Sequence, residues 1–206
     1  MTAWLTRIAL DLRHSAARRD LSDITAMHRR VMSLVPDDLG EQARHRAGVL
    51  FRLDYTVAGP VLLIQTALPP DPSRLPDGYG TVDTRDISPL LKALTSGMAV
   101  HYRIAANASK KAWKGDIAGK IVALSGRTAE EWWERKAKAN GLDVRHLRAQ
   151  PQPAARGRTV PVFHAITLFE GKAVIADADQ VRAAVLSGIG RGRSYGCGLL
   201  SLAPVR

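Results

Sequence analysis

The sequence predicts an α+β fold built from two similar halves. Its 206 residues suffice for one large domain or two small ones, and a hydrophobic content of 46% is that of an ordinary globular protein. Segments with strand-like alternation are interrupted by segments with helical spacing of apolar residues. The order strand, helix, strand, strand, helix, strand occurs once in the first half of the chain and again, more broken up, in the second.

The first half begins with an alternating strand and a polar, basic connection. Ser22 or Asp23 can then cap a helix that ends before Pro36. Two β-rich runs around a Gly-Pro turn are typical of a hairpin. We expect strands at residues 3–12, 49–55, 61–66 and 98–105. We expect helices at 24–35 and 87–94, the second one short, with a connection at 14–20 and a loop at 69–80.

The second half repeats this order around a polar excursion. Thr128 and Glu131 have the spacing of a capping box, Gly141 can end that helix, and Asp177 or Asp179 can cap the last one. We expect strands at residues 120–124, 142–147, 160–169, 172–176 and 197–202. We expect helices at 130–140 and 180–186 and the polar excursion at 148–158.

This repeated order is that of ferredoxin-like domains, which include RNA-recognition domains. We therefore predict two tandem ferredoxin-like (RRM-like, βαββαβ) domains, at residues 1–108 and 120–206, joined by a basic linker at 109–119.

Charge is the most informative bulk property. Thirty basic and nineteen acidic residues give a net charge of +11. Thirteen basic and five acidic residues fall within 103–158, a balance of +8, whereas residues 1–102 carry only +1 and residues 159–206 only +2. A concentrated excess of this kind favours a surface that meets a polyanion such as nucleic acid over a merely well-solvated basic protein.

Several function classes lack their motifs. No HExxH pattern or other metal-ligand spacing occurs among the six histidines, and neither a GxxxxGK[ST] phosphate loop nor a GxSxG elbow is found. The single cysteine, Cys197, excludes an internal disulfide. No apolar run is long enough to span a membrane, and no signal peptide is evident. We expect a cytoplasmic protein that uses no metal, cofactor or nucleotide.

Of the six histidines, His28 is the strongest candidate for a general acid or base. Its place on the predicted helix puts it at the rim of the buried face, half in contact with solvent, with Arg29 pointing further out. A rim histidine titrating near neutrality can act as a general base or acid, for instance toward a ribose 2′-hydroxyl. From the residues alone, a structural histidine is the more common case.

Basic side chains elsewhere are candidates for binding phosphates. Lys110, Lys111 and Lys114 lie close to Trp113 in the sequence. This segment can be either a solvated linker or a surface that binds RNA phosphates. Arg156 and Arg158 lie in the polar excursion that Arg148 begins, and guanidinium groups suit phosphate forks. Of the adjacent Trp132 and Trp133, we expect one in the core, since neighbouring helix positions face different ways.

The segment 188–198 combines five glycines with two arginines and a tyrosine. Glycines allow close backbone approach, and free N–H groups in such a loop can bind an anion. Because the loop follows a helix and leads into a strand, a nucleotide-hydrolysing phosphate loop is disfavoured. We interpret Gly190, Arg191, Gly192 and Arg193 as a platform for RNA phosphates.

Taken together, nine stretches resemble the CRISPR-associated endoribonucleases of type I-E systems, the CasE (Cse3) family. Their order and spacing make the match specific, and it covers nearly the whole chain. The most distinctive stretches are the closing two. The nine lie at residues 4–7, 17–21, 27–29, 50–54, 63–66, 102–107, 168–171, 188–193 and 198–204.

The resemblance implies two ferredoxin-like domains that bind the repeat stem-loop of precursor CRISPR RNA. It implies metal-independent cleavage at the 3′ base of the stem, leaving a 2′,3′-cyclic phosphate and a 5′-hydroxyl. It also implies that the protein stays on the mature guide RNA and joins the other subunits of the Cascade complex.

By the matching motif, His28 takes the family's catalytic histidine position, with Arg29 as possible support. The family often has a tyrosine three residues earlier, where this chain has Thr25. Arg18, Arg19, Lys110 and Lys111 fall in matched basic segments. The alternatives left open are a non-catalytic tandem RRM-like RNA-binding module, for which an aromatic RNP pattern is missing, and a small basic enzyme of nucleotide metabolism.

Overall fold

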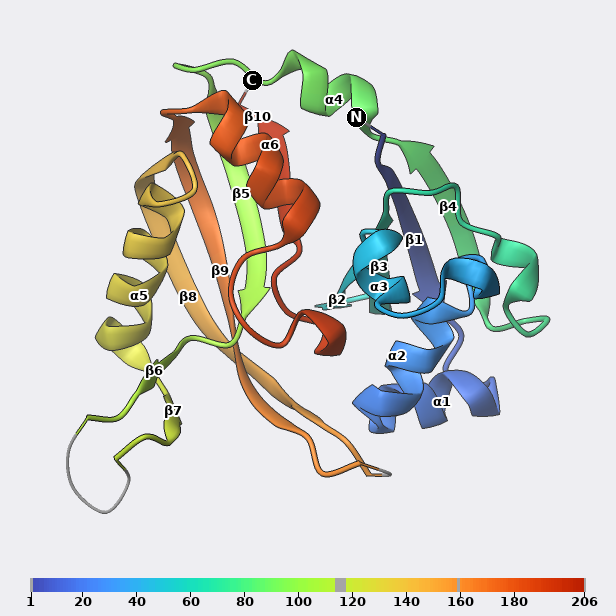
Figure 1. The fold of residues 1–206 in the computed structure, drawn as a ribbon. Coiled ribbons are helices and arrows are strands. Elements are labelled where there is room, and N and C mark those ends of the chain that lie inside the picture. The colour runs from blue at the N-terminus through green and yellow to red at the C-terminus, as the bar shows by residue number, and fades with distance from the viewer. Residues whose placement is uncertain (1, 114–117, 159, 206) are drawn as a thin grey trace.

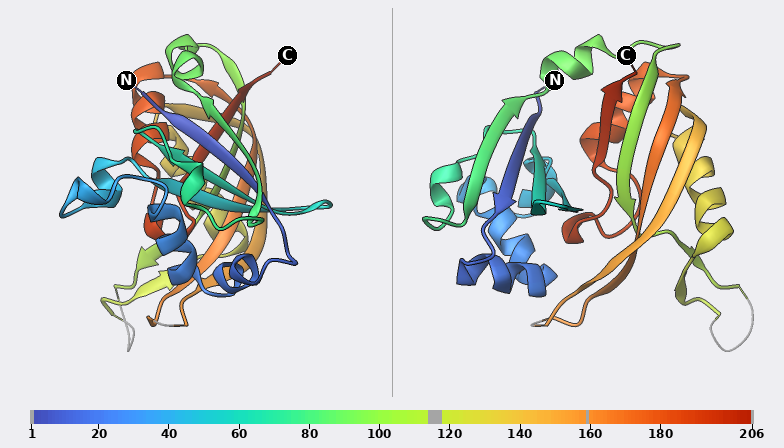
Figure 2. Two further views of the ribbon diagram at one scale, coloured as in Figure 1. Left: turned by 90° about the vertical axis from the view of Figure 1, so that its right-hand side faces the viewer. Right: turned by 180° about the vertical axis from the view of Figure 1, so that it is seen from behind.

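The computed structural model describes residues 2–113, 118–158 and 160–205. Within them the chain forms two four-stranded antiparallel sheets with helices packed on them and one small two-stranded sheet (Figure 1). Figure 2 shows the two large sheets side by side, with a long hairpin reaching from the second sheet toward the helices of the first half.

The first sheet has the strand order β2-β3-β1-β4. Two consecutive helices connect its first two strands, and short helical turns fill the loops. Its elements are β1 (Trp4–Leu10), α1 (Ser15–Ser22), α2 (Ile24–Met32), η1 (Asp37–Leu39), α3 (Ala43–Arg46), β2 (Leu50–Thr56), β3 (Gly59–Thr66), η2 (Pro72–Arg74) and β4 (Gly80–Asp86).

Helix α4 (Ser88–Ala93) leads into the second sheet, whose order is β10-β5-β9-β8. Both orders are those of a ferredoxin-like sheet, so the predicted fold class is confirmed. The remaining elements are β5 (Ala99–Ala106), β6 (Ser109–Lys111), β7 (Ile121–Ala123), α5 (Gly126–Lys138), β8 (Leu142–Arg156), β9 (Phe163–Ile175), α6 (Ala178–Ser187), η3 (Arg193–Tyr195) and β10 (Leu200–Pro204).

The strand expected to close the first half belongs to the second sheet. Strand β5 pairs with β9 and β10, and its buried Val100, Tyr102 and Ile104 lie in the second core. The first sheet is closed instead by β4, which lacks a strand signal because Val82 is its only large apolar residue. Among the described residues, the strand expected at 120–124 pairs with β6 alone, outside either large sheet.

The prediction of a polar excursion is also wrong. Residues 148–156 continue β8, which pairs with β9 in one long hairpin, so the two strands expected around Glu170 and Gly171 are one. Strand β8 is the edge strand, where Pro151 and Pro153 are tolerated. Gly171 lies at a β-bulge, where a Cβ would come within 1.9 Å of the His146 carbonyl oxygen, so this glycine permits close approach of two strands.

Three helix details differ from expectation. The connection at 14–20 is helix α1, and α2 starts afresh at Ile24. The capping box does not form, because α5 begins before Thr128, and Glu131 pairs with Arg127. Trp132 and Trp133 are both buried, and both stack on Phe169.

Candidate active site

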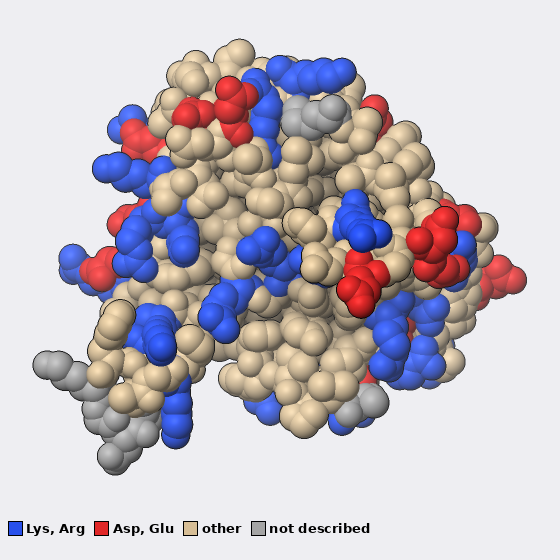
Figure 3. All heavy atoms as spheres, in the orientation of Figure 1, with Lys and Arg blue, Asp and Glu red and all other residues tan. Residues whose placement is uncertain are grey.

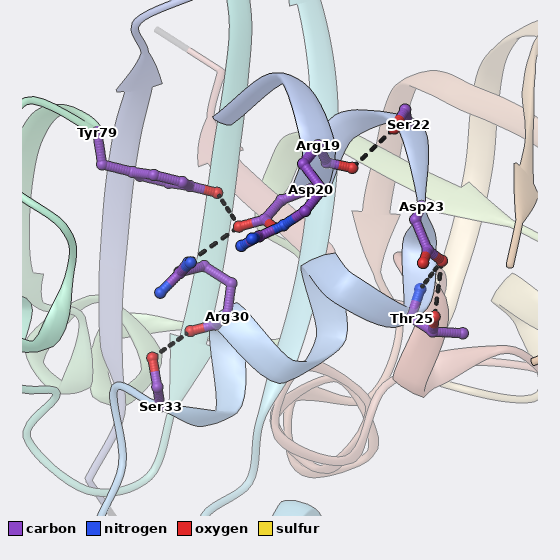
Figure 4. Close-up of polar contacts among 8 residues, drawn as sticks. All are labelled: Arg19, Asp20, Ser22, Asp23, Thr25, Arg30, Ser33 and Tyr79. Atoms are coloured by element: carbon purple, nitrogen blue, oxygen red, sulfur yellow. Dashed lines mark hydrogen bonds and ion pairs between the residues drawn. The ribbon is translucent and has the colours of Figure 1, made fainter. Parts of the chain in front are cut away.

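The corner between α1 and α2 is held by a buried carboxylate. Asp20, 1% exposed, accepts hydrogen bonds from Arg30 Nε at 2.9 Å and from the Tyr79 hydroxyl at 3.1 Å, and it pairs with Arg19 at 3.2 Å (Figure 4). An arginine from each helix and a tyrosine from the loop before β4 thus share one anion. These contacts fix the direction in which α2 leaves the corner.

Asp23 caps the N-terminus of α2, as the sequence predicted. Its Oδ1 accepts hydrogen bonds from the Thr25 backbone N–H at 3.0 Å and from Thr25 Oγ1 at 2.6 Å (Figure 4). The same oxygen accepts from the backbone N–H of Arg158, at the end of the β8–β9 hairpin, at 3.1 Å. One carboxylate therefore joins the helix that carries His28 to the tip of the basic hairpin.

His28 lies on the second turn of α2 and is half-buried, as predicted. Its Nδ1 is buried and meets no hydrogen-bond partner among the described residues. Burial lowers the pKa of His28 below 6.5, and the positive charges of Arg44 and Arg29 lower it further. These effects favour the neutral imidazole, the form that can accept a proton.

The glycine loop brings a tyrosine to this histidine. The Tyr195 ring centroid is 6.1 Å from that of His28. Gly196, next to it, has a φ of +81°, and a Cβ there would lie 3.4 Å from the Phe51 ring of β2. The loop is also hydrogen-bonded to itself, since the Gly192 carbonyl accepts from the N–H groups of Tyr195 and Cys197. This compact turn packs Tyr195 against the first half.

A second histidine lies close to the same tyrosine. The His164 ring on β9 is 5.5 Å from the Tyr195 ring, with an angle of 31° between their planes. A Cβ at Gly192 would lie 3.5 Å from His164 Cδ2, so the loop backbone packs directly on the imidazole. Burial lowers the pKa of His164, and the charge of Arg191 adds to this effect.

Arginines surround this cluster of rings. Arg44 is held by a hydrogen bond from Nη1 to the Val49 carbonyl, and Arg193 by bonds to the Gly190 and Ser187 carbonyls. The two guanidinium groups are close enough for the charge of Arg193 to add to the effect of burial in lowering the pKa of Arg44. Neutral imidazoles among fixed cations can carry out acid–base chemistry on a bound phosphate.

The other predicted residues are distributed around this centre. Thr25 is buried and bonded to Asp23, whereas Arg29 is exposed and lines a hollow on α1 and α2 with Arg19 and Arg30. Arg18 is exposed and anchored to the carbonyls of residues 12 and 13.

The predicted basic residues of the second half are spread more widely. Arg156 lies over the Phe163 ring at 5.1 Å. Arg148 faces Glu170, and Lys110 and Lys111 are exposed on β6, so these three are not brought to His28; Lys114 lies outside the described residues. Gly190 and Gly192 both have positive φ. Arg191 is exposed, and its backbone forms an isolated antiparallel β-bridge with Asn107. Figure 3 shows Lys and Arg side chains across the width of this face, from the β6–β7 end to the α1 end.

Sequence reasoning missed Tyr195, His164 and Arg44. The one available signal was the position of Tyr195 inside the glycine loop, since its aromatic ring is out of place in a plain connection. Among the described residues, no group of three or more His, Cys, Asp or Glu side chains could hold a metal ion. Within the same residues, no helix is long and apolar enough to cross a membrane.

Comparison with known proteins identifies the family of this chain. A family model for CRISPR-associated proteins matches residues 3–204. The CRISPR-associated endoribonuclease Cse3 of Thermus thermophilus is 32% identical, with 98% of this chain and 100% of that protein covered.

Two solved structures extend this similarity. Thermus thermophilus Cse3 bound to an RNA representing a pre-cleavage complex has a TM-score of 0.84 at 31% identity, covering 99% of this chain and 100% of that one. A chain of a CRISPR RNA-guided surveillance complex, described as pre-nicking, has a TM-score of 0.75 at 38% identity, covering 98% and 100%. The family resemblance noted from the sequence is confirmed: this chain belongs to the CasE (Cse3) family of CRISPR-associated proteins of type I-E systems.

Proposed function

We propose that this chain is an endoribonuclease that binds the repeat stem-loop of precursor CRISPR RNA and cuts it at the 3′ base of the stem. It then stays on the guide RNA, together with the other Cascade subunits. The observation that carries the proposal is the meeting of His28, Tyr195 and fixed arginines in one half-buried site. The relatives named above, one called an endoribonuclease and one solved with RNA, support it.

The reaction is an internal transfer at phosphorus. The 2′-hydroxyl loses its proton and its oxygen attacks the adjacent phosphorus, while the bond from phosphorus to the 5′-oxygen breaks. The departing oxygen gains a proton. The products are a 2′,3′-cyclic phosphate and a 5′-hydroxyl, and no water is consumed. His28, whose surroundings favour the neutral ring, takes part in these proton transfers without a metal ion.

The cations stabilise the crowded phosphate. Arg193 and Arg44 are both tied to backbone carbonyls, so their positions are set before RNA arrives. Fixed donors of this kind need no reorganisation when charge develops in the transition state. Thr25 supports the site indirectly, through the cap that orients α2.

The RNA stem is bound on the basic surface around this site. Arg18, Arg19 and Arg29 supply cations from the helices, and Arg156, Arg158 and Arg191 supply them from the hairpin and the loop. Because the major groove of an RNA helix is too deep and narrow for side chains to read, these contacts are mainly to phosphates and to shape. Lys110, Lys111 and Arg148 extend the surface further from the cut, and Lys114, outside the described residues, is a further candidate for binding RNA.

The test compares His28→Ala with the wild type on a repeat stem-loop in EDTA. We expect single-turnover cleavage to fall by roughly 10²- to 10⁴-fold, while stem-loop binding is retained. His101→Ala, which removes an exposed histidine from β5 on the second sheet, is the matched control and should cut normally.

Wild-type-like cutting by the His28 variant would reject the assignment. Binding without cutting by the wild-type protein itself would favour the non-catalytic RNA-binding module. A wild type that cuts only when a divalent cation replaces EDTA would reject the metal-independent reaction.

A further inference from the structure

We propose that His164 is the general acid of the cleavage reaction, the group that gives a proton to the departing 5′-oxygen. This inference rests on the proposed ribonuclease activity and deepens it by naming a second catalytic residue. It starts from geometry: two half-buried imidazoles, on α2 and β9, both lie against a single aromatic ring.

The position of His164 is fixed by contacts with its neighbours. Its ring is tilted 31° from the Tyr195 ring, and the backbone at Gly192 packs on its edge. The following residue of β9 is fixed as well, because Asn107 Nδ2 donates to the Ala165 carbonyl at 2.8 Å. Nothing in the fold alone requires a titratable ring here, since an apolar residue would fill the same contact with Tyr195.

The reaction needs two proton transfers at opposite ends of the phosphate. One group takes the 2′-hydroxyl proton, and another protonates the 5′-oxygen as its bond to phosphorus breaks. A single histidine would have to cross the phosphate to do both, whereas His28 and His164 come to the site from different elements and supply two separate groups. After the cut, His28 holds the extra proton and His164 lacks one, so exchange with water resets both.

Burial lowers the pKa of both imidazoles, and neighbouring charges then distinguish them. At His28, Arg44 and Arg29 add to this effect and Nδ1 is buried without a partner in the described structure, which favours the neutral ring that a base requires. At His164 the added charge is that of Arg191, which is exposed. When RNA phosphates neutralise Arg191, His164 becomes the easier ring to protonate, as an acid requires.

A stem-loop in which sulfur replaces the bridging 5′-oxygen at the cut tests this role. A thiolate leaves far more readily than an alkoxide because its conjugate acid is much stronger, so it needs no general acid. We expect His164→Ala to cut the oxygen substrate roughly 10²- to 10⁴-fold more slowly than the wild type, and the sulfur substrate within about tenfold of it. His28→Ala should be slow on both, and His101→Ala normal on both.

Normal cutting of the oxygen substrate by the His164 variant would overturn the proposal. So would equal loss on the two substrates in a variant that binds the stem-loop normally. If His164→Ala unfolds at a lower temperature, His164→Gln, which keeps a polar side chain of similar size, is used in its place. Sulfur rescue of Tyr195→Phe instead would assign the acid role to the tyrosine. A wild type that cuts neither substrate rejects the ribonuclease itself, and a fully active His28→Ala rejects only the role given to His28.

Discussion

At the scale of single residues, burial and neighbouring charge act on His28 in the same direction. Both disfavour the protonated ring, so its pKa lies below 6.5. Cleavage should therefore rise with pH as His28 loses its proton, and this rise should be complete at a lower pH than for an unshifted histidine. The groups that face His28 are Arg29, Arg44 and Tyr195.

Replacing Arg44 with Gln removes one of these cations. The pKa of His28 then moves up toward its usual value, and the rising limb of the pH–rate profile moves to higher pH. The maximal rate is also lower, because a phosphate ligand is lost. Single-turnover rates measured from about pH 4.5 to about pH 8 report both changes. Arg46→Gln, on the same helix but exposed, should leave the limb in place. An equal shift in both variants, or none in either, contradicts the proposed electrostatics.

Sequence identified one member of the ring cluster and missed the others for a physical reason. His28 stands out through local helical spacing and through its matched motif. Tyr195 and His164 reach it only after two sheets have formed and packed, and no local pattern marks such a meeting. Their residue types were visible, but their proximity is a property of the tertiary fold.

At the scale of elements, Asp23 links the helix that carries His28 to the basic hairpin through the Arg158 N–H group. Loss of an N-cap carboxylate typically lowers the free energy of unfolding by about 1 kcal/mol. We expect this loss in Asp23→Ala, measured by urea unfolding, together with slower cleavage because α2 and the hairpin tip are no longer joined.

Asp177→Ala is the matched control for this element. Asp177 caps α6 through the N–H groups of Asp179 and Gln180, at the base of the hairpin rather than at its tip. It should cost a similar free energy of unfolding but leave cleavage at the wild-type rate. Equal loss of cleavage in both variants would show that stability alone, and not the link to the hairpin, is responsible.

Elements with strong alternation or caps were predictable, and those defined by their neighbours were not. Strands β2 and β3 and the Asp23 cap follow from local sequence. Helix α1 was missed because Asp20, a residue type expected in solvent, is its buried anchor. Strand β5 was placed in the wrong sheet because its sequence specifies a strand but not its partners.

At the scale of the whole molecule, the two halves are joined by a buried charged residue. Arg52 of β2 is 2% exposed and pairs with Asp54 at 2.8 Å. Its Nη1 reaches the second half, where it donates to the Arg103 carbonyl on β5 and to the Leu199 carbonyl in the loop before β10. It also donates to Ser201 Oγ on β10. The arginine therefore holds the sheets in one arrangement, which in turn keeps Tyr195 beside His28.

Removing Arg52 tests whether the site depends on this arrangement. Arg52→Ala leaves Asp54 with only the more distant Arg103, at 3.7 Å, and strips donors from two carbonyls. We expect a loss of about 3 to 5 kcal/mol in the free energy of unfolding, against at most about 1 kcal/mol for Arg85→Ala, whose pair with Asp83 is exposed. At temperatures where the variant is still folded, cleavage should fall while binding to the stem changes less, because most of the basic surface is intact. Full cleavage by a folded Arg52→Ala protein would mean that other contacts suffice to hold the loop against α2.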